Sequence, residues 1–196
     1  WQNVRAHLAF GLPFQGAKII NLLKDLISPT FFALYAGTAA VGYINWASMV
    51  MNYPLLAVLL LQRLYMPLFA RLATDMEHFK KMLHTIVSLV ALLVYTLSAL
   101  VFVFRYEITV AVFGEKWLEA LVLFLPSMLI NVVLAPAVIA MSALNALGHS
   151  RSVFWMTVAI TIATWLFGGV GVAQFGWPMW GWANLLVHLL YVGLLV

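Results

Sequence analysis

Residues 11–35 read GLPFQGAKIINLLKDLISPTFFALY, an apolar run that contains Lys18, Lys24 and Asp25 yet is long enough to cross a bilayer. A hydrocarbon core about 30 Å thick takes about 20 helical residues to cross. A charged residue at bilayer depth costs on the order of 2.5–3.5 kcal/mol on insertion scales. Such residues usually face a water-filled cavity or a partner, so this run predicts a membrane helix that borders a polar space.

The composition of the whole chain points the same way. Of its 196 residues, 65% are hydrophobic and 8% are charged, and the mean hydropathy is +1.04. Soluble domains carry about 25% charged residues, so the composition predicts an integral membrane protein. There is no cysteine and hence no disulfide or thiolate site. The chain begins at Trp1 with no signal-peptide pattern, and we expect it to be a piece of a longer protein.

Six hydrophobic segments have about the length of a membrane span. They are residues 11–35, 41–64, 82–104, 120–146, 153–170 and 178–196. Between the second and third, residues 64–83 place apolar side chains at three- and four-residue spacing opposite charged ones, which predicts an amphipathic helix along the inner surface. We therefore predict an all-α fold, a polytopic membrane helix bundle with about six transmembrane helices, forming a single lobe over residues 1–196.

The positions of the cations predict the orientation. With a cytoplasmic N-terminus, the inner side carries six cations and the outer side two, which are diluted by acidic residues, and this is the bias expected of cytoplasmic loops. The inner cations are Arg5, Arg63, Arg71, Lys80, Lys81 and Arg151, and the outer ones are Arg105 and Lys116. Tryptophans fall near the predicted span ends, as in an aromatic belt.

Within each predicted span, the few polar residues recur at three- or four-residue spacing, so they share one side of a helix. These stripes are Gln15, Lys18, Asn21, Asp25 and Ser28; Asn45, Ser48, Asn52 and Arg63; His84, Ser88, Tyr95 and Ser98; Ser127, Asn131, Ser142 and Asn145; Thr157, Thr161 and Thr164; and Asn184, His188 and Tyr191. Six such stripes predict a bundle with a polar interior. Interhelical hydrogen bonding, at about 0.6 kcal/mol per bond, is the alternative, and we favour it for the third, fifth and sixth stripes.

The first stripe differs from the others because it contains ionisable side chains. Lys24 and Asp25 are neighbours that point about 100° apart, so we do not expect them to pair, and Lys18 is two turns from Asp25. Each then needs water, a substrate or a group on another helix. Together with Arg63 they predict one cavity with three cations and one carboxylate. Low-dielectric walls around net positive charge concentrate anions, so the cavity is expected to bind an anion.

Prolines fall in the same spans as the polar residues. Pro29, Pro54 and Pro136 each free the carbonyl of the residue four positions back. Broken helices at membrane depth are tolerated where the exposed backbone lines a cavity, a frequent feature of transporters. Pro29 follows the charged pair directly, and we expect it to break the first span there.

Other kinds of site are not indicated. The five histidines show no metal-ligand spacing, and no pattern resembles a nucleophile elbow, a phosphate-binding glycine loop or a paired-carboxylate site. We therefore expect no catalytic residues, no metal, no cofactor and no enzyme activity. The basic inner loop is better explained as an orientation signal than as a nucleic-acid surface.

Several stretches resemble a known family. NLLKDLISPTFFALYAGTAAVGYINWA, YPLLAVLLLQRLYMPLFARL, VFGEKWLEA and LNALG occur in the order seen in bacterial polysaccharide-synthesis flippases. These belong to the multidrug/oligosaccharidyl-lipid/polysaccharide exporter superfamily, and the O-antigen flippase type is the most similar. The resemblance covers nearly the whole chain; its most specific parts are GTAAVGY, the P-x-F-A-R-L ending and the F-G-x-K-W turn.

The resemblance implies a second lobe. Family members have about twelve or more spans in two six-helix lobes around a cationic lumen, so a first lobe of the same protein would be a partner, with the membrane lipids. It implies flipping of an undecaprenyl-diphosphate-linked oligosaccharide from the inner to the outer leaflet of the bacterial inner (cytoplasmic) membrane, by alternating access, for surface polysaccharide such as O-antigen in lipopolysaccharide. Many relatives carry an aspartate where this chain has Ser28, which leaves the coupling-ion role of Asp25 open.

Roles for individual residues follow from the polar stripes and this resemblance together. Lys18, Lys24 and Arg63 would hold the diphosphate, because Lys and Arg suit phosphate oxygens. Asn21, Asn52 and Asn131 would bind sugar or phosphate, and Asp25 is the candidate for a coupling cation. The alternatives are a cation-coupled multidrug exporter of the same superfamily, a membrane-embedded glycan ligase and an assembly subunit.

Overall fold

The computed structural model describes the backbone of residues 2–195 and the side chains of residues 11–193. Apart from short turns between helices, the described part is helical and contains no strand, which confirms the predicted all-α fold. Its elements are α1 (Gln2–Leu72), α2 (Met76–Val103), α3 (Arg105–Ile108), the π-helix η1 (Thr109–Phe113), the 3-10 helix η2 (Glu115–Leu123), α4 (Phe124–Ala146), α5 (Ser150–Ala163), the π-helix η3 (Thr164–Gly168), α6 (Gly169–Phe175) and α7 (Met179–Leu195).

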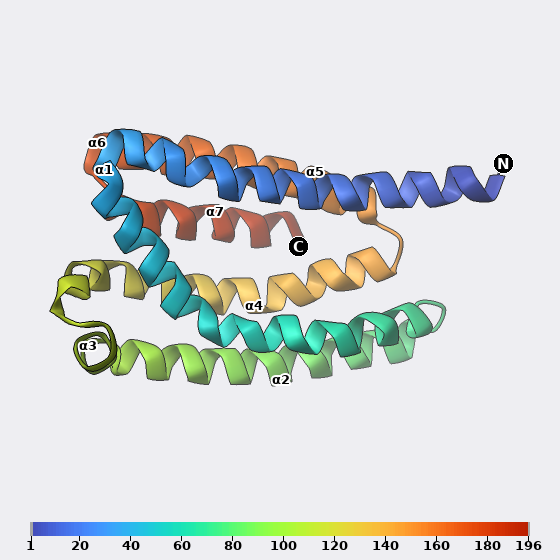
Figure 1. Cartoon of the computed structure of the whole chain (residues 1–196). Helices are drawn as coiled ribbons and strands as arrows, with labels where there is room; N and C mark the ends of the chain where they lie inside the picture. The colour runs from blue at the N-terminus through green and yellow to red at the C-terminus, as the bar shows by residue number, and fades with distance from the viewer. Residues whose placement is uncertain (1, 196) are drawn as a thin grey trace.

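Four helical stretches within the described residues are long and apolar enough to cross a membrane. They are Gly11–Leu72, Met76–Val103, Glu115–Ala146 and Ser150–Phe175. The chain is thus built as a membrane protein, and the count of six spans stays a prediction. The helices run back and forth between two ends of the bundle (Figure 1). We call the end with the connections at 73–75 and 147–149 the turn end, and the end with the α2–α4 and α6–α7 connections the kink end.

α1 consists of two arms that meet at Gly37. This glycine has φ 84° and ψ 162°, a backbone conformation that other residues rarely adopt. The first arm runs beside α5, and the second crosses to lie against α2 and α4 (Figure 1). The prediction of a break at Pro29 was wrong, because helical backbone continues through that residue and the break comes at Gly37.

Proline is tolerated inside these helices because a neighbouring group can bond the carbonyl that the proline leaves free. Pro136 frees the carbonyl of Val132, and the Tyr95 hydroxyl of α2 donates to that oxygen at 2.8 Å. The third polar stripe therefore supplies an interhelical hydrogen bond, as the packing interpretation expects.

The amphipathic surface helix predicted over residues 64–83 is a second correction. Residues 64–72 continue α1, residues 73–75 form a tight turn, and α2 begins at Met76. Asp75 caps α2, since its side chain accepts a hydrogen bond from the backbone N–H of His78. The apolar spacing comes from two antiparallel helices that pack on each other, with the rings of Phe69 and Phe79 5.3 Å apart.

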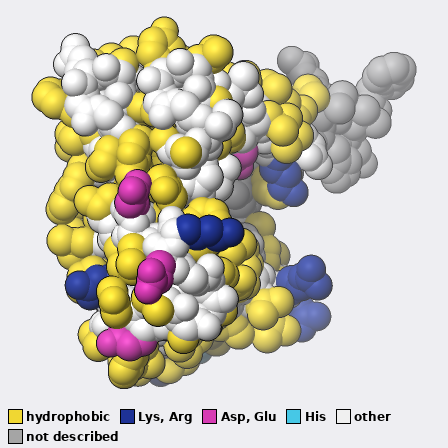
Figure 2. Space-filling model, turned by 60° about the vertical axis from the view of Figure 1, so that its left-hand side comes forward, with side chains coloured by type: hydrophobic (Ala, Val, Ile, Leu, Met, Phe, Trp, Pro, Cys, Tyr) yellow, Lys and Arg dark blue, Asp and Glu magenta, His cyan; other side chains and the backbone are white. Residues whose placement is uncertain are grey.

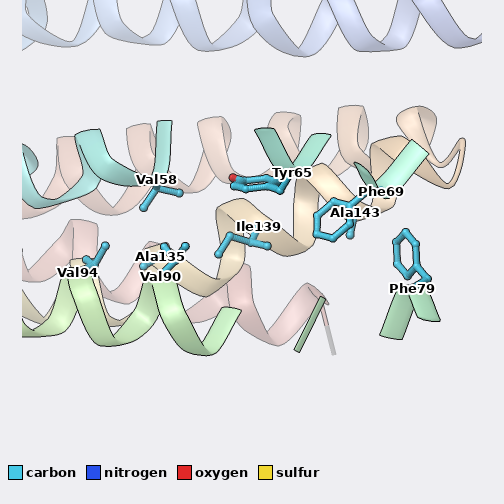
Figure 3. Close-up of a cluster of buried hydrophobic side chains, with 9 residues drawn as sticks. All are labelled: Val58, Tyr65, Phe69, Phe79, Val90, Val94, Ala135, Ile139 and Ala143. Carbon is cyan, nitrogen blue, oxygen red and sulfur yellow. The ribbon is translucent and has the colours of Figure 1, made fainter. Parts of the chain in front are cut away.

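The second arm of α1, α2 and α4 share the hydrophobic core shown in Figure 3. Its buried side chains are Val58, Tyr65, Phe69, Phe79, Val90, Val94, Ala135, Ile139 and Ala143. A second buried cluster lies toward the kink end, where Trp46 of α1 stacks on Trp117 of η2 at 5.1 Å between ring centroids. In a view turned toward the kink end, hydrophobic side chains are spread over the whole described surface and only a few charged side chains lie among them (Figure 2). These two clusters fix the helices that form one wall of the site.

Candidate lumen and its charged groups

Two hollows follow one another along the inside of the bundle. The first, which we call the Lys24 hollow, has a volume of about 360 Å³ and lies toward the kink end. Its walls come from both arms of α1 and from α4, η3 and α7. Its polar lining side chains are Lys24, Asp25, Ser28, Asn45, Ser48, Asn52, Ser127, Asn131, Thr164, Asn184 and His188.

Five of the six predicted polar stripes contribute to this lining, those of the first, second, fourth, fifth and sixth segments. The stripe of the third segment does not, because α2 lines neither hollow and packs on the outer side of α1 and α4. The polar interior predicted from helical periodicity is therefore present. It belongs to the helices around α1 rather than to all six segments equally.

The second hollow, which we call the Arg63 hollow, has a volume of about 1070 Å³ and lies toward the turn end. It contains Lys18 and Asn21 from the first arm of α1 and Arg63 from the second arm. Asn145 of α4 adds an amide, and its Oδ1 atom is buried without a hydrogen-bond partner. No carboxylate lines this hollow in the described part of the chain.

The structure thus divides the residues predicted to form one cavity between two. Lys24, Asp25, Asn52 and Asn131 line the first hollow, and Lys18, Asn21 and Arg63 line the second. The prediction of one cavity with three cations and one carboxylate is corrected accordingly. The reason is the length of α1, since Lys18 and Lys24 are six residues apart and so about 9 Å along the helix axis.

Lys24 and Asp25 form an ion pair, which the sequence analysis did not expect. Lys24 Nζ lies 3.7 Å from Asp25 Oδ1, because the four-carbon lysine side chain reaches around the helix to its neighbour. This distance exceeds the 2.7–2.9 Å of a strong charge-assisted hydrogen bond, so the contact is weak. Lys24 is 26% exposed and Asp25 is 72% exposed, and both remain accessible from the hollow.

The cations of the Arg63 hollow are not neutralised. Among the described residues, neither Lys18 nor Arg63 has a carboxylate within ion-pair distance. Lys18 Nζ lies 4.5 Å from the centroid of the Phe14 ring, a cation–π contact of the kind that contributes about 0.5–1 kcal/mol at exposed sites. Such a contact orients the ammonium group without cancelling its charge.

Asn131 is held by the protein. Its Nδ2 atom donates to the carbonyl of Met51 at 2.7 Å and to Ser98 Oγ at 3.0 Å, and the residue is 1% exposed. These bonds tie α4 to α1 and α2. The arrangement supports a packing role for Asn131, whereas Asn52 and Asn21 are exposed on the hollow walls.

His188 of α7 is a lining residue that the sequence analysis did not single out as a site. Its Nδ1 lies 2.7 Å from the carbonyl of Asn184, so this nitrogen carries the proton and Nε2 is left as an acceptor. Its signal was present in the sixth polar stripe, which was interpreted as packing. Among the described residues, no three His, Asp or Glu side chains come together in a way that could hold a metal ion.

Comparison with known proteins adds one finding. The model of a family described as polysaccharide biosynthesis protein matches residues 1–122, which is 122 of the 196 residues. The match includes both arms of α1 and therefore every cation that lines the two hollows. Searches among curated proteins and among solved structures found no match.

Proposed function

Because the chain belongs to the polysaccharide biosynthesis protein family, we propose that it is one lobe of a flippase for a lipid-linked oligosaccharide. The substrate would be an undecaprenyl-diphosphate-linked oligosaccharide, moved from the inner to the outer leaflet of the bacterial inner membrane for surface polysaccharide such as O-antigen. The partner would be a first lobe of the same protein. Its work would be transport rather than catalysis.

The observation that carries this proposal is the convergence of cations and neutral polar groups inside apolar, membrane-length helices. A diphosphate is bound best by Lys and Arg, and Lys18, Lys24 and Arg63 all line the hollows. Sugar hydroxyls are bound by amides and hydroxyls, which Asn21, Asn52 and the polar wall of the Lys24 hollow supply.

The order of the hollows suggests a path for the substrate. The Arg63 hollow is the wider one and lies at the turn end, which the cation distribution predicts to be cytoplasmic. A diphosphate would first meet the unpaired Lys18 and Arg63 and then move toward Lys24. Rocking of this lobe against the first lobe would open the lumen to the other side, which is how alternating access works in transporters built of two such lobes.

The test uses the complete protein in cells. Lys18→Ala, Lys24→Ala and Arg63→Ala are each expected to abolish surface polysaccharide while membrane abundance stays normal. Lys80→Ala is the matched control, because Lys80 is an exposed cation of α2 and lines neither hollow. Normal surface polysaccharide in all three lumen variants would refute the proposed charge roles.

One observation favours a second candidate, a cation-coupled multidrug exporter of the same superfamily. Asp25 is 72% exposed in the Lys24 hollow and could bind a cationic substrate or a coupling ion. Drug resistance conferred by the protein and lost in Asp25→Asn would support that function. Surface polysaccharide that depends on the three cations, without drug resistance, would support the flippase.

A further inference from the structure

A third hollow, which we call the apolar groove, lies between the first arm of α1 and the junction of η3 with α6. It has a volume of about 270 Å³. Ile27, Ser28, Phe31, Phe32, Trp165 and Gly169 line it. Apart from the serine hydroxyl and the indole N–H, the groove presents hydrocarbon and aromatic surface.

The apolar groove shares a wall with the Lys24 hollow, since Ser28 and Phe32 line both. Trp165 Nε1 donates to Ser28 Oγ at 3.3 Å, and Ser28 Oγ donates in turn to the carbonyl of Lys24 at 2.7 Å. One hydrogen bond between side chains therefore spans the boundary between a polar and an apolar space. Lys24 lies one helical turn from this boundary.

The local backbone produces this arrangement. The π-helix η3 places Thr164 on the Lys24 hollow and the next residue, Trp165, on the apolar groove. Short π-helical turns inside α-helical segments occur frequently at functional sites. At Gly169, a Cβ atom would lie 3.2 Å from the Phe31 ring, so a larger residue there would crowd the groove.

We propose that the apolar groove holds the first part of the isoprenoid chain of the lipid carrier while its diphosphate lies at Lys24. This inference rests on the proposed flippase function and adds a path for the tail. In a polyprenyl diphosphate the charged head is bonded directly to the hydrocarbon, so head and tail need a polar and an apolar site side by side. The chain would leave the lumen between the first arm of α1 and α6, once the Trp165–Ser28 hydrogen bond opens.

The role of the groove is to place the tail rather than to increase affinity. Lipid tails are as apolar as leucine side chains, so moving a chain from lipid to the groove brings no hydrophobic gain. The test therefore has to report where the isoprenoid chain lies on the protein. Ile27 lines the groove and Leu23, one turn earlier on the same helix, lines none of the three hollows, yet each is 47% exposed.

The experiment places the photoreactive residue p-benzoylphenylalanine at Ile27 or Leu23 in the complete protein, in phospholipid nanodiscs with radiolabelled C55 polyprenyl diphosphate. Labelling at Ile27 is expected to exceed that at Leu23 several-fold. Excess inorganic pyrophosphate or the Lys24→Gln substitution should remove this excess. The uncharged polyprenol should label both positions equally. A second pair, Trp165 and Phe167 at 42% and 44% exposed, repeats the comparison from the other wall should the first pair fail to fold.

The outcomes separate the two proposals. Equal labelling at paired positions, or phospholipid adducts alone, while polyprenyl diphosphate still binds and depends on Lys24, would overturn the groove and leave the flippase proposal standing. No binding of polyprenyl diphosphate to the unmodified protein would overturn both.

Discussion

The Lys24 hollow and the Arg63 hollow share walls from α1, α4 and α7 but differ in size and in charge balance. The Lys24 hollow is about 360 Å³ and contains a lysine with an aspartate 3.7 Å away. The Arg63 hollow is about 1070 Å³ and contains two cations and, among the residues that the structure describes, no carboxylate. The charged residues of both hollows all come from α1, which gives the larger space a net positive charge and the smaller space a cation that is partly neutralised.

This difference suggests a division of work. An unpaired cation in a cleft attracts an anion over a distance, whereas a cation beside a carboxylate attracts it less and releases it more easily. A transported anion must be bound and also released. We therefore interpret the Arg63 hollow as the place of capture and the Lys24 hollow as the place from which the substrate moves on.

Reversing the charge at Arg63 should give the largest effect. Arg63→Glu puts a carboxylate where we propose that the diphosphate is captured, and at about 4 Å two unit charges interact by about 4 kcal/mol at an effective dielectric of 20. We expect pyrophosphate binding to weaken by at least about a hundredfold, measured with radiolabelled pyrophosphate on purified protein. Lys80→Glu is the control with the same charge change, and an equal loss in that variant would show that only net charge matters.

Neutralising Lys24 and neutralising Asp25 should change the affinity for pyrophosphate in opposite directions. Lys24→Gln removes the cation and is expected to weaken pyrophosphate binding about tenfold. Asp25→Asn removes the partial neutralisation and should strengthen binding by a few-fold, because Asp25 is exposed and its effect is screened by water. Titrations of the two variants measure this difference, and a weakening in both would contradict the assigned charge balance.

Two asparagines that line the Lys24 hollow are expected to contribute unequally to the stability of the protein. Asn131→Ala removes two interhelical hydrogen bonds and is expected to cost about 1–2 kcal/mol, seen as a lower melting temperature in detergent. Asn52→Ala is expected to leave the melting temperature unchanged, because Asn52 is exposed on the hollow wall. The reverse pattern would make Asn52 the structural residue.

The smallest expected effect is a change in the pH dependence of the melting temperature, caused by Asp75 at the turn end, outside both hollows. The pKa of Asp75 is lowered because its carboxylate accepts hydrogen bonds from the backbone N–H and the ring of His78. A lowered pKa stabilises the fold above the ordinary aspartate range and ceases to do so as pH falls below about 4. Melting temperatures should therefore drop more on acidification in the parent than in Asp75→Ala, with pyrophosphate binding at neutral pH equal in both.

The sequence predicted the helical fold and the polar stripes because both depend on periodicity. Asn45, Ser48 and Asn52 share a helix face whatever the tertiary structure, and the same side faces the lumen here. The break at Gly37 could not be placed in this way, since glycine permits a positive φ without requiring it. The proline at residue 29 gave a stronger but misleading signal.

The periodicity of the polar residues also could not predict that the site is divided into two hollows. It depends on where α4 and α7 approach α1, and helix-to-helix distances do not appear in a pattern of residue types. The Lys24–Asp25 contact depends on how a flexible side chain bends, and the packing role of Asn131 depends on which carbonyl lies opposite. The position of Trp165 on the apolar groove depends on how α5 and η3 pack against α1.

The most direct test of the central claim uses the absence of cysteine from the chain. Asn21→Cys places a thiol on the Arg63 hollow, and Leu92→Cys places one on α2, which lines neither hollow. A water-filled, electropositive lumen predicts that an anionic methanethiosulfonate reagent modifies Cys at position 21 faster than a cationic reagent does, while position 92 stays unmodified. Equal rates with both reagents, or no reaction at position 21, would contradict it.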